Sequence, residues 1–162
     1  MRASKPRRTR PIRMSISLPE ITRYFHEAIP LTRALGLEVA SWDGTSVSLS
    51  APLEPNHNHT DTAFGGSISS LAILAGYCLL HLTLLERNIS GRILIGSTSC
   101  EFLRPIDADF AATARAPEPA VMDEFLGNLQ RKRRGRLEIA SEVHCHKVLS
   151  ARHSGVYVAM LF

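Results

Sequence analysis

The stretch Asn56-His57-Asn58-His59-Thr60-Asp61-Thr62-Ala63-Phe64-Gly65-Gly66-Ser67 is polar, ends in a glycine pair and runs directly into an apolar segment at 68–85. We interpret this motif segment, 56–67, as a loop that enters a long helix. The first N–H groups of a helix lack intrahelical partners and carry partial positive charge, so they can bind an oxygen that becomes negative during a reaction. The glycine pair would let a substrate approach this backbone closely. Gly-Gly is also a common turn signal, so the pair by itself fits a simple tight turn equally well.

The segment that follows the glycines, from Ser67 to about Arg87, is apolar nearly all the way round. This pattern predicts a helix that is surrounded by other structure. Its most apolar part, 71–85, is fifteen residues long and contains His81. A membrane span needs about 20 apolar residues. We therefore expect a core helix and no membrane partner.

Before this helix the sequence predicts a short amphipathic helix and a β-hairpin. Ser17 and Glu20 have the spacing of a capping box, and apolar residues then recur at helical spacing. Residues 37–42 and 46–51 alternate between apolar and polar side chains around an Asp-Gly pair, which is a strong hairpin signal.

After the central helix the pattern is mostly that of strands. The strand expected at 92–104 would carry Ile93 and Ile95 on one face and Leu94 and Cys100 on the other. Further strands are expected at 108–116, 137–145 and 149–161, with a short amphipathic helix at 122–129 and a helix stop at Gly135. The order of elements predicts an α+β fold with a mostly antiparallel sheet wrapped around the central helix.

The composition fits one globular domain behind a basic tail. The chain has 162 residues and 44% of them are hydrophobic, which is enough for a real core. Six of its nineteen Lys and Arg residues lie in 1–14, and without them thirteen bases face fifteen acids. We expect a disordered tail at 1–14, one domain at 15–162 and no nucleic-acid partner. Met14 is a second candidate for the start of the protein.

Several classes of chemistry have no support in the sequence. The three cysteines are an odd number in apolar contexts, so we expect buried thiols, a reducing compartment and a cytoplasmic location. No signal peptide is evident. The sequence lacks Gly-x-Gly-x-x-Gly, a Walker loop, Cys-x-x-Cys and Gly-x-Ser-x-Gly. We therefore expect no cofactor and no nucleophilic role for Ser67.

Four short motifs together resemble the hot-dog fold thioesterases. They are Pro52-Leu53, Asn56 with Asn58, Thr62-Ala63-Phe64-Gly65-Gly66-Ser67, and Phe102-Leu103-Arg104-Pro105. More narrowly, 29–161 resembles the putative thioesterase domain called YiiD C-terminal. The resemblance implies a hot-dog fold, a thioester substrate carried by coenzyme A or acyl carrier protein, and a homodimer or dimer of dimers with sites at the subunit interface.

The resemblance implies a reaction centre within the motif segment. The N–H of Gly66, with that of Gly65 or Ser67, would polarise the thioester carbonyl and stabilise the oxyanion. Asn58 and Thr62 would orient the substrate or a water, although simple loop capping is the competing role for both. The residues expected to contact substrate are Asn56, Phe64, Gly65 and Ser67.

A general base is harder to assign. Many hot-dog hydrolases place an Asp or Glu one to two turns into the central helix, but 71–75 is wholly apolar here. His59 remains because histidine titrates near neutral pH, and Asp61 because it is the only carboxylate in the motif segment. Asp61 could equally be a turn former.

Two rival functions fit the same pocket. Decarboxylation of a malonyl thioester needs an oxyanion hole to hold the enolate, and no residue has to activate water. An apolar pocket would also favour loss of the carboxylate charge. The third interpretation is a noncatalytic module that binds acyl thioesters, because fold does not fix function.

Two further groups of residues carry weaker signals. His144 and His146 share a predicted strand face and could meet His153 across a hairpin, but they lack a convincing further ligand, so we expect no metal. The run Arg131 to Arg134 could contact coenzyme A phosphates or an acidic carrier protein, or simply complement a helix C-terminus.

Overall fold

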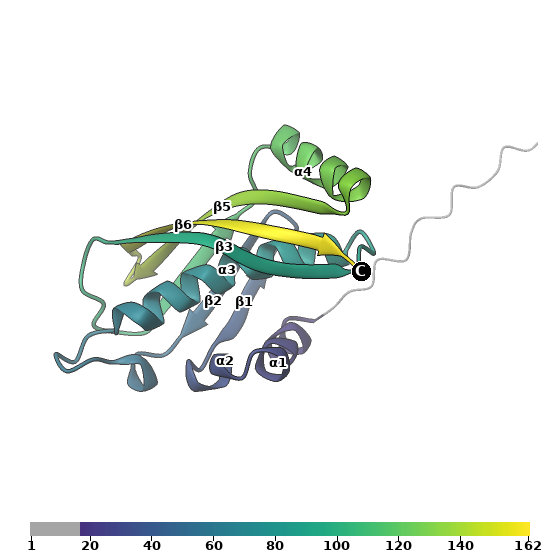
Figure 1. Cartoon of the computed structure of the whole chain (residues 1–162). Coiled ribbons are helices and arrows are strands. Elements are labelled where there is room, and N and C mark those ends of the chain that lie inside the picture. Colours follow the sequence, from purple (N-terminus) through teal and green to yellow (C-terminus); the bar gives the residue numbers. More distant parts are fainter. Residues whose placement is uncertain (1–16) are drawn as a thin grey trace, which may run out of the picture.

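The computed structural model describes residues 17–162, and a six-stranded antiparallel sheet of order β1-β2-β4-β5-β6-β3 wraps around one long helix, α3 (Figure 1). The predicted tail at 1–14 lies outside the described residues. The predicted α+β architecture with a central helix is confirmed. The helices are α1 Leu18–Ala28, α2 Leu31–Ala34, α3 Gly65–Leu85 and α4 Pro119–Lys132. The strands are β1 Glu38–Trp42, β2 Ser46–Ala51, β3 Gly91–Phe102, β4 Phe110–Arg115, β5 Arg134–Cys145 and β6 Val148–Leu161.

The N-terminal helix forms as its capping box predicts. Glu20 N donates to Ser17 Oγ, and Ser17 N donates to Glu20 Oε2 at 2.8 Å. α1 then packs on the edge strand β1, where Val39 N donates to Thr22 Oγ1 at 2.9 Å. The short helix α2 was not predicted, because four residues after Pro30 are too few to show a helical period.

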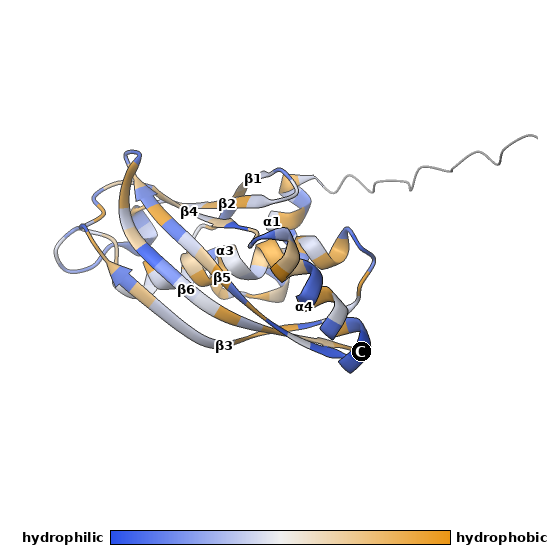
Figure 2. Ribbon diagram, turned by 90° about the horizontal axis from the view of Figure 1, so that it is seen from above, coloured by the Kyte–Doolittle hydropathy of each residue, from blue (hydrophilic) through white to orange (hydrophobic). Residues whose placement is uncertain are grey.

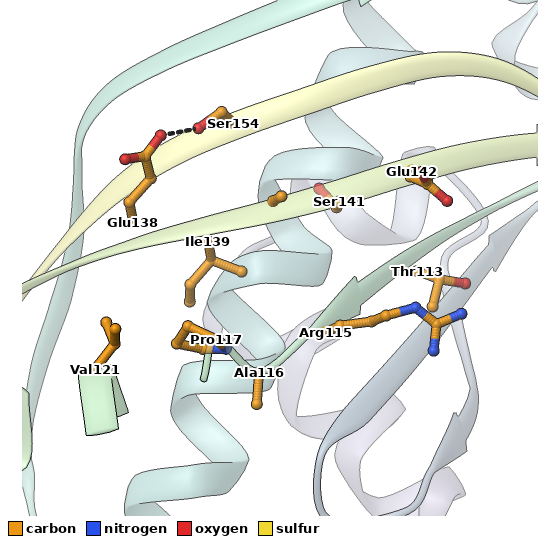
Figure 3. A pocket seen from close by; sticks show the side chains of 11 residues that line it. Thr113, Arg115, Ala116, Pro117, Val121, Glu138, Ile139, Ser141, Glu142 and Ser154 are labelled. Carbon is orange, nitrogen blue, oxygen red and sulfur yellow. Dashed lines mark hydrogen bonds between the residues drawn. The ribbon is translucent and has the colours of Figure 1, made fainter. Parts of the chain in front are cut away.

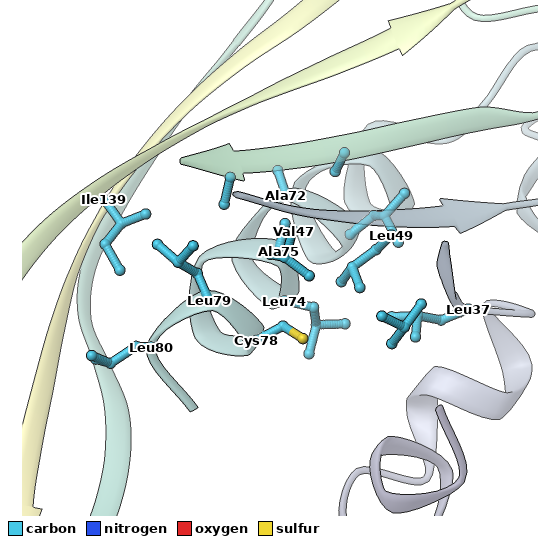
Figure 4. Packing of buried hydrophobic residues seen from close by; sticks show 14 of the residues in the cluster. Leu37, Val47, Leu49, Ala72, Leu74, Ala75, Cys78, Leu79, Leu80 and Ile139 are labelled. Carbon is cyan, nitrogen blue, oxygen red and sulfur yellow. The ribbon is translucent and has the colours of Figure 1, made fainter. Parts of the chain in front are cut away.

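α3 lies at the centre of the core and supplies ten of its buried apolar side chains (Figure 4). It is long and apolar enough to cross a membrane by length and composition, yet 67% of its most apolar window is buried. In the view of Figure 2 its ribbon lies behind β5 and β6. This burial matches the predicted core helix, because a helix that is apolar all round needs cover on most sides.

Two side chains from the sheet bind the backbone of α3 near its middle. Ser141 Oγ on β5 donates to the carbonyl of Ala72 at 2.9 Å, and Tyr157 Oη on β6 donates to the carbonyl of Ile73 at 2.7 Å. Gly76 makes the second bond possible, because a Cβ at this position would collide with the Tyr157 hydroxyl. The helix is therefore fixed to the sheet by polar as well as apolar contacts.

The predicted faces of β3 are wrong beyond its middle. The register with β6 shifts between Ile95 and Ser97, which is a β-bulge. Ile93 pairs with Ala159 and Cys100 with His153, so Ile93 and Cys100 lie on the same face although they are seven residues apart. The extra residue reverses the alternation that the sequence suggests.

The C-terminal half follows the predicted order with two differences in its turns. α4 ends at Lys132, and the stop is made by the following residue Arg133, which has a left-handed φ of 58°, rather than by Gly135. The turn between β5 and β6 is made by His146 and Lys147, with φ of 51° and 63°. His146 therefore lies in a turn, and His144 is on the outward-facing side of β5. His153 is on the inward-facing side of β6, so the predicted approach of these two histidines to His153 does not occur.

Candidate active site at the start of the central helix

The motif segment is a compact loop held from inside by Asn56. Asn56 is only 2% exposed, and its Nδ2 donates to the carbonyls of Leu35 and Pro52 at 2.8 and 2.7 Å. Its own carbonyl accepts from Phe64 N at 2.7 Å. Both side-chain N–H groups are used, so this amide holds the loop and has no donor left for the expected contact with a substrate.

Asn58 organises the outer part of the same loop. Its Oδ1 accepts from Thr60 N and Thr60 Oγ1, both at 2.8 Å, while its Nδ2 donates to Thr62 Oγ1 at 3.1 Å. The backbone closes the loop with a bond from Asn58 N to Thr62 O at 2.7 Å. The geometry supports the loop-capping role for Asn58, with the Thr62 hydroxyl bound within the same loop.

The two candidate bases lie at the tip of the loop. His59 is exposed, and its side chain makes no hydrogen bond to any residue in 17–162. Asp61 is exposed as well and has a left-handed φ of 58°, which suits the turn-forming role that its residue type predicts. Neither side chain is held in one orientation by the surrounding residues.

The start of α3 presents the predicted row of unpaired amides. The first intrahelical bond runs from Ile68 N to Phe64 O at 3.0 Å, so the N–H groups of Gly65, Gly66 and Ser67 precede it. No side chain caps this end. The three amides and the helix dipole together can stabilise negative charge on an oxygen that lies at the helix axis.

Phe64 explains why the second glycine is needed. Its ring is 57% exposed and lies against Gly66, where a Cβ would collide with the ring edge. Gly66 itself is exposed. The ring therefore forms an apolar wall beside the amides, and only glycine leaves room for it.

A pocket of about 350 Å³ opens beside this helix start. From the motif segment it is lined by Thr62 and Gly65, and from the segment after β3 by Phe102 through Ile106. Arg104 is the only charged residue in the lining. The sequence pointed to Phe102-Leu103-Arg104-Pro105 only as part of a resemblance, and the fold brings it against Gly65 because Ala63 N donates to Ile106 O at 2.8 Å.

α3 offers no acid or base near this pocket. Its sequence from Gly65 to Leu85 contains no carboxylate, and Ile73 occupies the half-exposed position two turns in. His81 lies fifteen residues after Gly66, which is about 22 Å along a helix. It stacks on Tyr24 at 4.6 Å between ring centroids, and burial lowers its pKa. His81 is therefore too far away to act at the helix start of its own subunit.

The most buried histidine belongs to a separate polar network. His153 Nδ1 lies 2.8 Å from Ser141 Oγ and His153 Nε2 lies 2.9 Å from Thr98 Oγ1. Because the Ser141 hydroxyl donates to Ala72, the serine accepts from Nδ1–H, and Nε2 accepts from Thr98. Burial lowers the pKa of His153, which favours this neutral form.

Two other regions lie apart from the predicted site. A pocket of about 530 Å³ on the solvent side of β4 and β5 contains Arg115, Thr113 and Glu142 and none of the predicted residues (Figure 3). The run Arg131 to Arg134 lies where β5 begins, at the end of the sheet where β3 starts. Phe102 is at the other end of β3, about 35 Å away for a strand of this length.

Comparison with known proteins places this geometry in a family. The family model described as "Putative thioesterase (yiiD_Cterm)" matches residues 18–161. A solved structure from Chlorobaculum tepidum, of a protein of unknown function, is similar with 25% identity and a TM-score of 0.84, covering 89% of this chain and 94% of that one.

Two solved thioesterase structures are also similar. The putative thioesterase from Shewanella oneidensis is 26% identical with a TM-score of 0.80, over 88% of this chain and 96% of that one. A thioesterase from Haemophilus influenzae is 12% identical with a TM-score of 0.73, over 92% and 94% of the two chains, and this likeness shows the fold alone. The fold is the predicted hot-dog fold.

Proposed function

The chain belongs to the putative thioesterase family of YiiD C-terminal domains, and we propose that it hydrolyses acyl thioesters at the start of α3. In this reaction water attacks the thioester carbonyl carbon and the carbonyl oxygen becomes an oxyanion. The C–S bond then breaks, the sulfur leaves as a thiol with a proton, and the acyl group leaves as a carboxylic acid.

The observation that carries the proposal is the row of unpaired amides beside the pocket. The N–H groups of Gly65, Gly66 and Ser67 precede the first helical bond, and Gly65 lines the pocket. A donor aimed at a developing oxyanion contributes about 3 to 4 kcal/mol to its stabilisation in other enzymes. The acyl carbonyl would bind with its oxygen at these amides and its chain over Phe102.

Water would be activated from the motif segment. His59 and Asp61 are the titratable side chains at the loop tip, and both are free to turn toward a bound substrate. A base need not be held in place before the substrate arrives, because catalytic hydrogen bonds often tighten only in the complex. We therefore keep His59 and Asp61 as the candidates, with Thr62 orienting the water.

The active form is proposed to be a homodimer joined along β3. On one edge of the sheet, α1 covers β1. On the other edge, no other part of residues 17–162 covers β3. Leu94 and Phe102 on this strand are 52% and 53% exposed. An exposed apolar edge strand is a template for pairing with another chain. Phe102 also lines the pocket, so a partner along β3 would complete the site.

The substrate carrier is proposed to be coenzyme A or acyl carrier protein, in the cytoplasm. Both carriers present the acyl group on a long thiol arm with phosphate, and Arg104 is the cation at the pocket that could meet an anionic group. All three cysteines, Cys78, Cys100 and Cys145, are free thiols, which suits a reducing compartment.

Decarboxylation of a malonyl thioester is the second candidate, and a specific observation favours it. The residues that line the pocket include neither a carboxylate nor a histidine. An enolate needs the same oxyanion hole, and loss of carbon dioxide needs no base. Arg104 could orient the leaving carboxylate.

The deciding experiment is turnover of a panel of acyl and malonyl thioesters on both carriers, with free thiol and acetyl thioester measured separately by mass. Thiol release with saturation kinetics is the expected result. Acetyl thioester without free thiol would replace hydrolysis by decarboxylation. Binding of these thioesters without formation of either product would show that the protein is a noncatalytic binding module.

A further inference from the structure

Three potential metal ligands lie close together at the turn between β5 and β6. His146 Nε2 lies 3.3 Å from Asp107 Oδ1, and Cys145 Sγ lies 3.9 Å from the same oxygen. The three donor atoms all lie within 4.8 Å of one another. We propose that Asp107, Cys145 and His146 bind a divalent transition metal, with Zn²⁺ as the best fit.

The fold brings these residues together from two separate segments. Cys145 ends β5 and His146 is the first residue of the turn to β6, while Asp107 lies between β3 and β4. His146 and Lys147 both have a left-handed φ, which is the geometry of a two-residue hairpin turn. This turn places the exposed imidazole of His146 beside Asp107.

The shape of the cluster favours a metal over a catalytic triad. In a Cys-His-Asp triad the groups form a chain, in which the acid contacts the histidine and the histidine contacts the sulfur. Here Asp107 Oδ1 is close to both the sulfur and the imidazole, and the three donor atoms all lie within 4.8 Å of one another. In a tetrahedral zinc site the ligand atoms lie about 3.3 to 3.6 Å apart, so a small inward movement of the sulfur would complete the geometry.

The chemistry of the donors selects the metal. A thiolate, an imidazole and a carboxylate are the three ligand types that zinc uses, whereas calcium and magnesium need oxygen ligands. The thiolate and carboxylate would also neutralise the charge of the ion. Cys145 is 5% exposed, which protects a thiolate from solvent, while the other two ligands are exposed and give the metal an entry path.

A metal with three protein ligands keeps one coordination position for water or another group. His146 also lines a pocket of about 670 Å³, together with Asp109 and with His57 and Asp61 of the motif segment. The open position would face this pocket. A bound metal would also connect the β5–β6 turn to the segment between β3 and β4. The carbonyl of Ile106 in that segment accepts from Ala63 N, so the metal would make the support of the motif segment more rigid.

Cobalt is the probe that reports the proposed thiolate ligand. Untagged, reduced protein is titrated with Co²⁺, and the expected result is one ion per chain with a sulfur-to-cobalt charge-transfer absorption that Zn²⁺ abolishes by displacement. Cys145→Ser should lose this absorption and Cys100→Ser should keep it, because Cys100 is a half-buried thiol on β3 outside the cluster.

A second variant keeps the test valid if Cys145→Ser does not fold. His146→Asn changes a side chain that is 68% exposed and should fold normally. Loss of this ligand should weaken Co²⁺ binding at least about tenfold, since even changes outside the ligand set cost about that much. His144→Asn is its matched control. Absence of the charge-transfer absorption in the wild-type protein, or unchanged binding in His146→Asn, would overturn the proposal without affecting the proposed thioesterase activity.

Discussion

Asn58 holds the motif segment through both ends of its side-chain amide. The side-chain oxygen of Asn58 accepts from Thr60, and its side-chain nitrogen donates to the hydroxyl of Thr62. The loop therefore needs an acceptor toward Thr60 and a hydrogen bond with the Thr62 hydroxyl at this position. Because the Thr62 hydroxyl can rotate to become the donor, an aspartate would keep both interactions.

We expect Asn58→Ala to lower kcat at least tenfold and Asn58→Asp to retain most activity. Misplacing a loop by about 1 Å is enough for such a loss in other enzymes, and Asp preserves the loop. The measurement is kcat and KM of both variants on the best thioester of the panel. An inactive Asn58→Asp with an intact fold would mean that the amide N–H itself contacts the substrate.

The second residue-scale prediction concerns the helix start. Gly66→Ala forces the exposed Phe64 ring away from the amides, so we expect kcat to fall by about 100-fold through misplacement of the substrate, while stability changes by less than about 1 kcal/mol. Urea unfolding and steady-state kinetics measure the two effects.

Gly127→Ala in α4 is the matched control for Gly66→Ala. A Cβ at Gly127 would meet only the far end of Arg131 at 4.0 Å, and glycine is about 1 kcal/mol less favourable than alanine inside a helix. This variant should therefore be more stable and fully active. Equal activity of Gly66→Ala and Gly127→Ala would remove the amide row from the mechanism.

Among the elements, the contact between α3 and the sheet is the one that should respond to pH. His153 is 3% exposed, bonded to Ser141 and Thr98, and neutral because burial lowers its pKa below the ordinary 6.5. Above pH 6.5 the folded and unfolded states are both neutral at this position. As the pH falls below 6.5 the unfolded state binds the proton first, so the free energy of unfolding decreases until the folded-state pKa is reached.

We expect the free energy of unfolding to fall by on the order of 1 kcal/mol between about pH 7 and about pH 5, with His153→Gln showing a shallower fall. Urea titrations across this range measure it. His81 contributes in the same direction because burial lowers its pKa too, so the slope of His153→Gln should not reach zero. An unchanged slope in His153→Gln would show that the network does not control the pH response.

Local sequence signals predicted most elements because each element depends on near neighbours. Ser17 and Glu20 lie within one turn, and the hairpin pair Asp43-Gly44 needs only its own backbone, with Gly44 at a φ of 97°. The bulge after Ile95 could not be predicted, because an extra residue in a strand is defined only against its partner strand.

Sequence patterns located those parts of the candidate active site that lie in one continuous segment of the chain. The amides of Gly65 to Ser67 follow from the helix start alone. Asn56 was expected to contact the substrate. Its actual partner, the carbonyl of Leu35, is 21 residues away in the sequence, so no local pattern could show that the side chain is already used. Arg104 and the cluster around Asp107 depend on the packing of the β3–β4 segment against the loop, which no local pattern reports.

At the scale of the whole molecule, the sheet has one covered edge and one open edge. Leu94 is 52% exposed and lies in the first half of the open strand, along which a second copy would pair. A natural sheet edge that stays single normally carries charge, a bulge, a short strand or a cover, and β3 has a bulge after Ile95. β3 is nevertheless twelve residues long and has an apolar run at 93–95 in its first half, so it fits the role of an interface strand.

We expect the protein to elute at twice its chain mass of 17.9 kDa and Leu94→Arg to shift it to the monomer with loss of turnover. Two arginines facing each other across a twofold interface repel and cannot be buried without partners. Size-exclusion chromatography with light scattering, run beside the thioester assay, measures both effects.

Val148→Arg is the matched control. Val148 is 45% exposed, and it is the first residue of β6, next to the turn from β5 and away from the open edge. A monomeric Leu94→Arg that keeps full turnover would mean that each subunit carries a complete site, and the water-activating group would then have to lie within the chain's own motif segment.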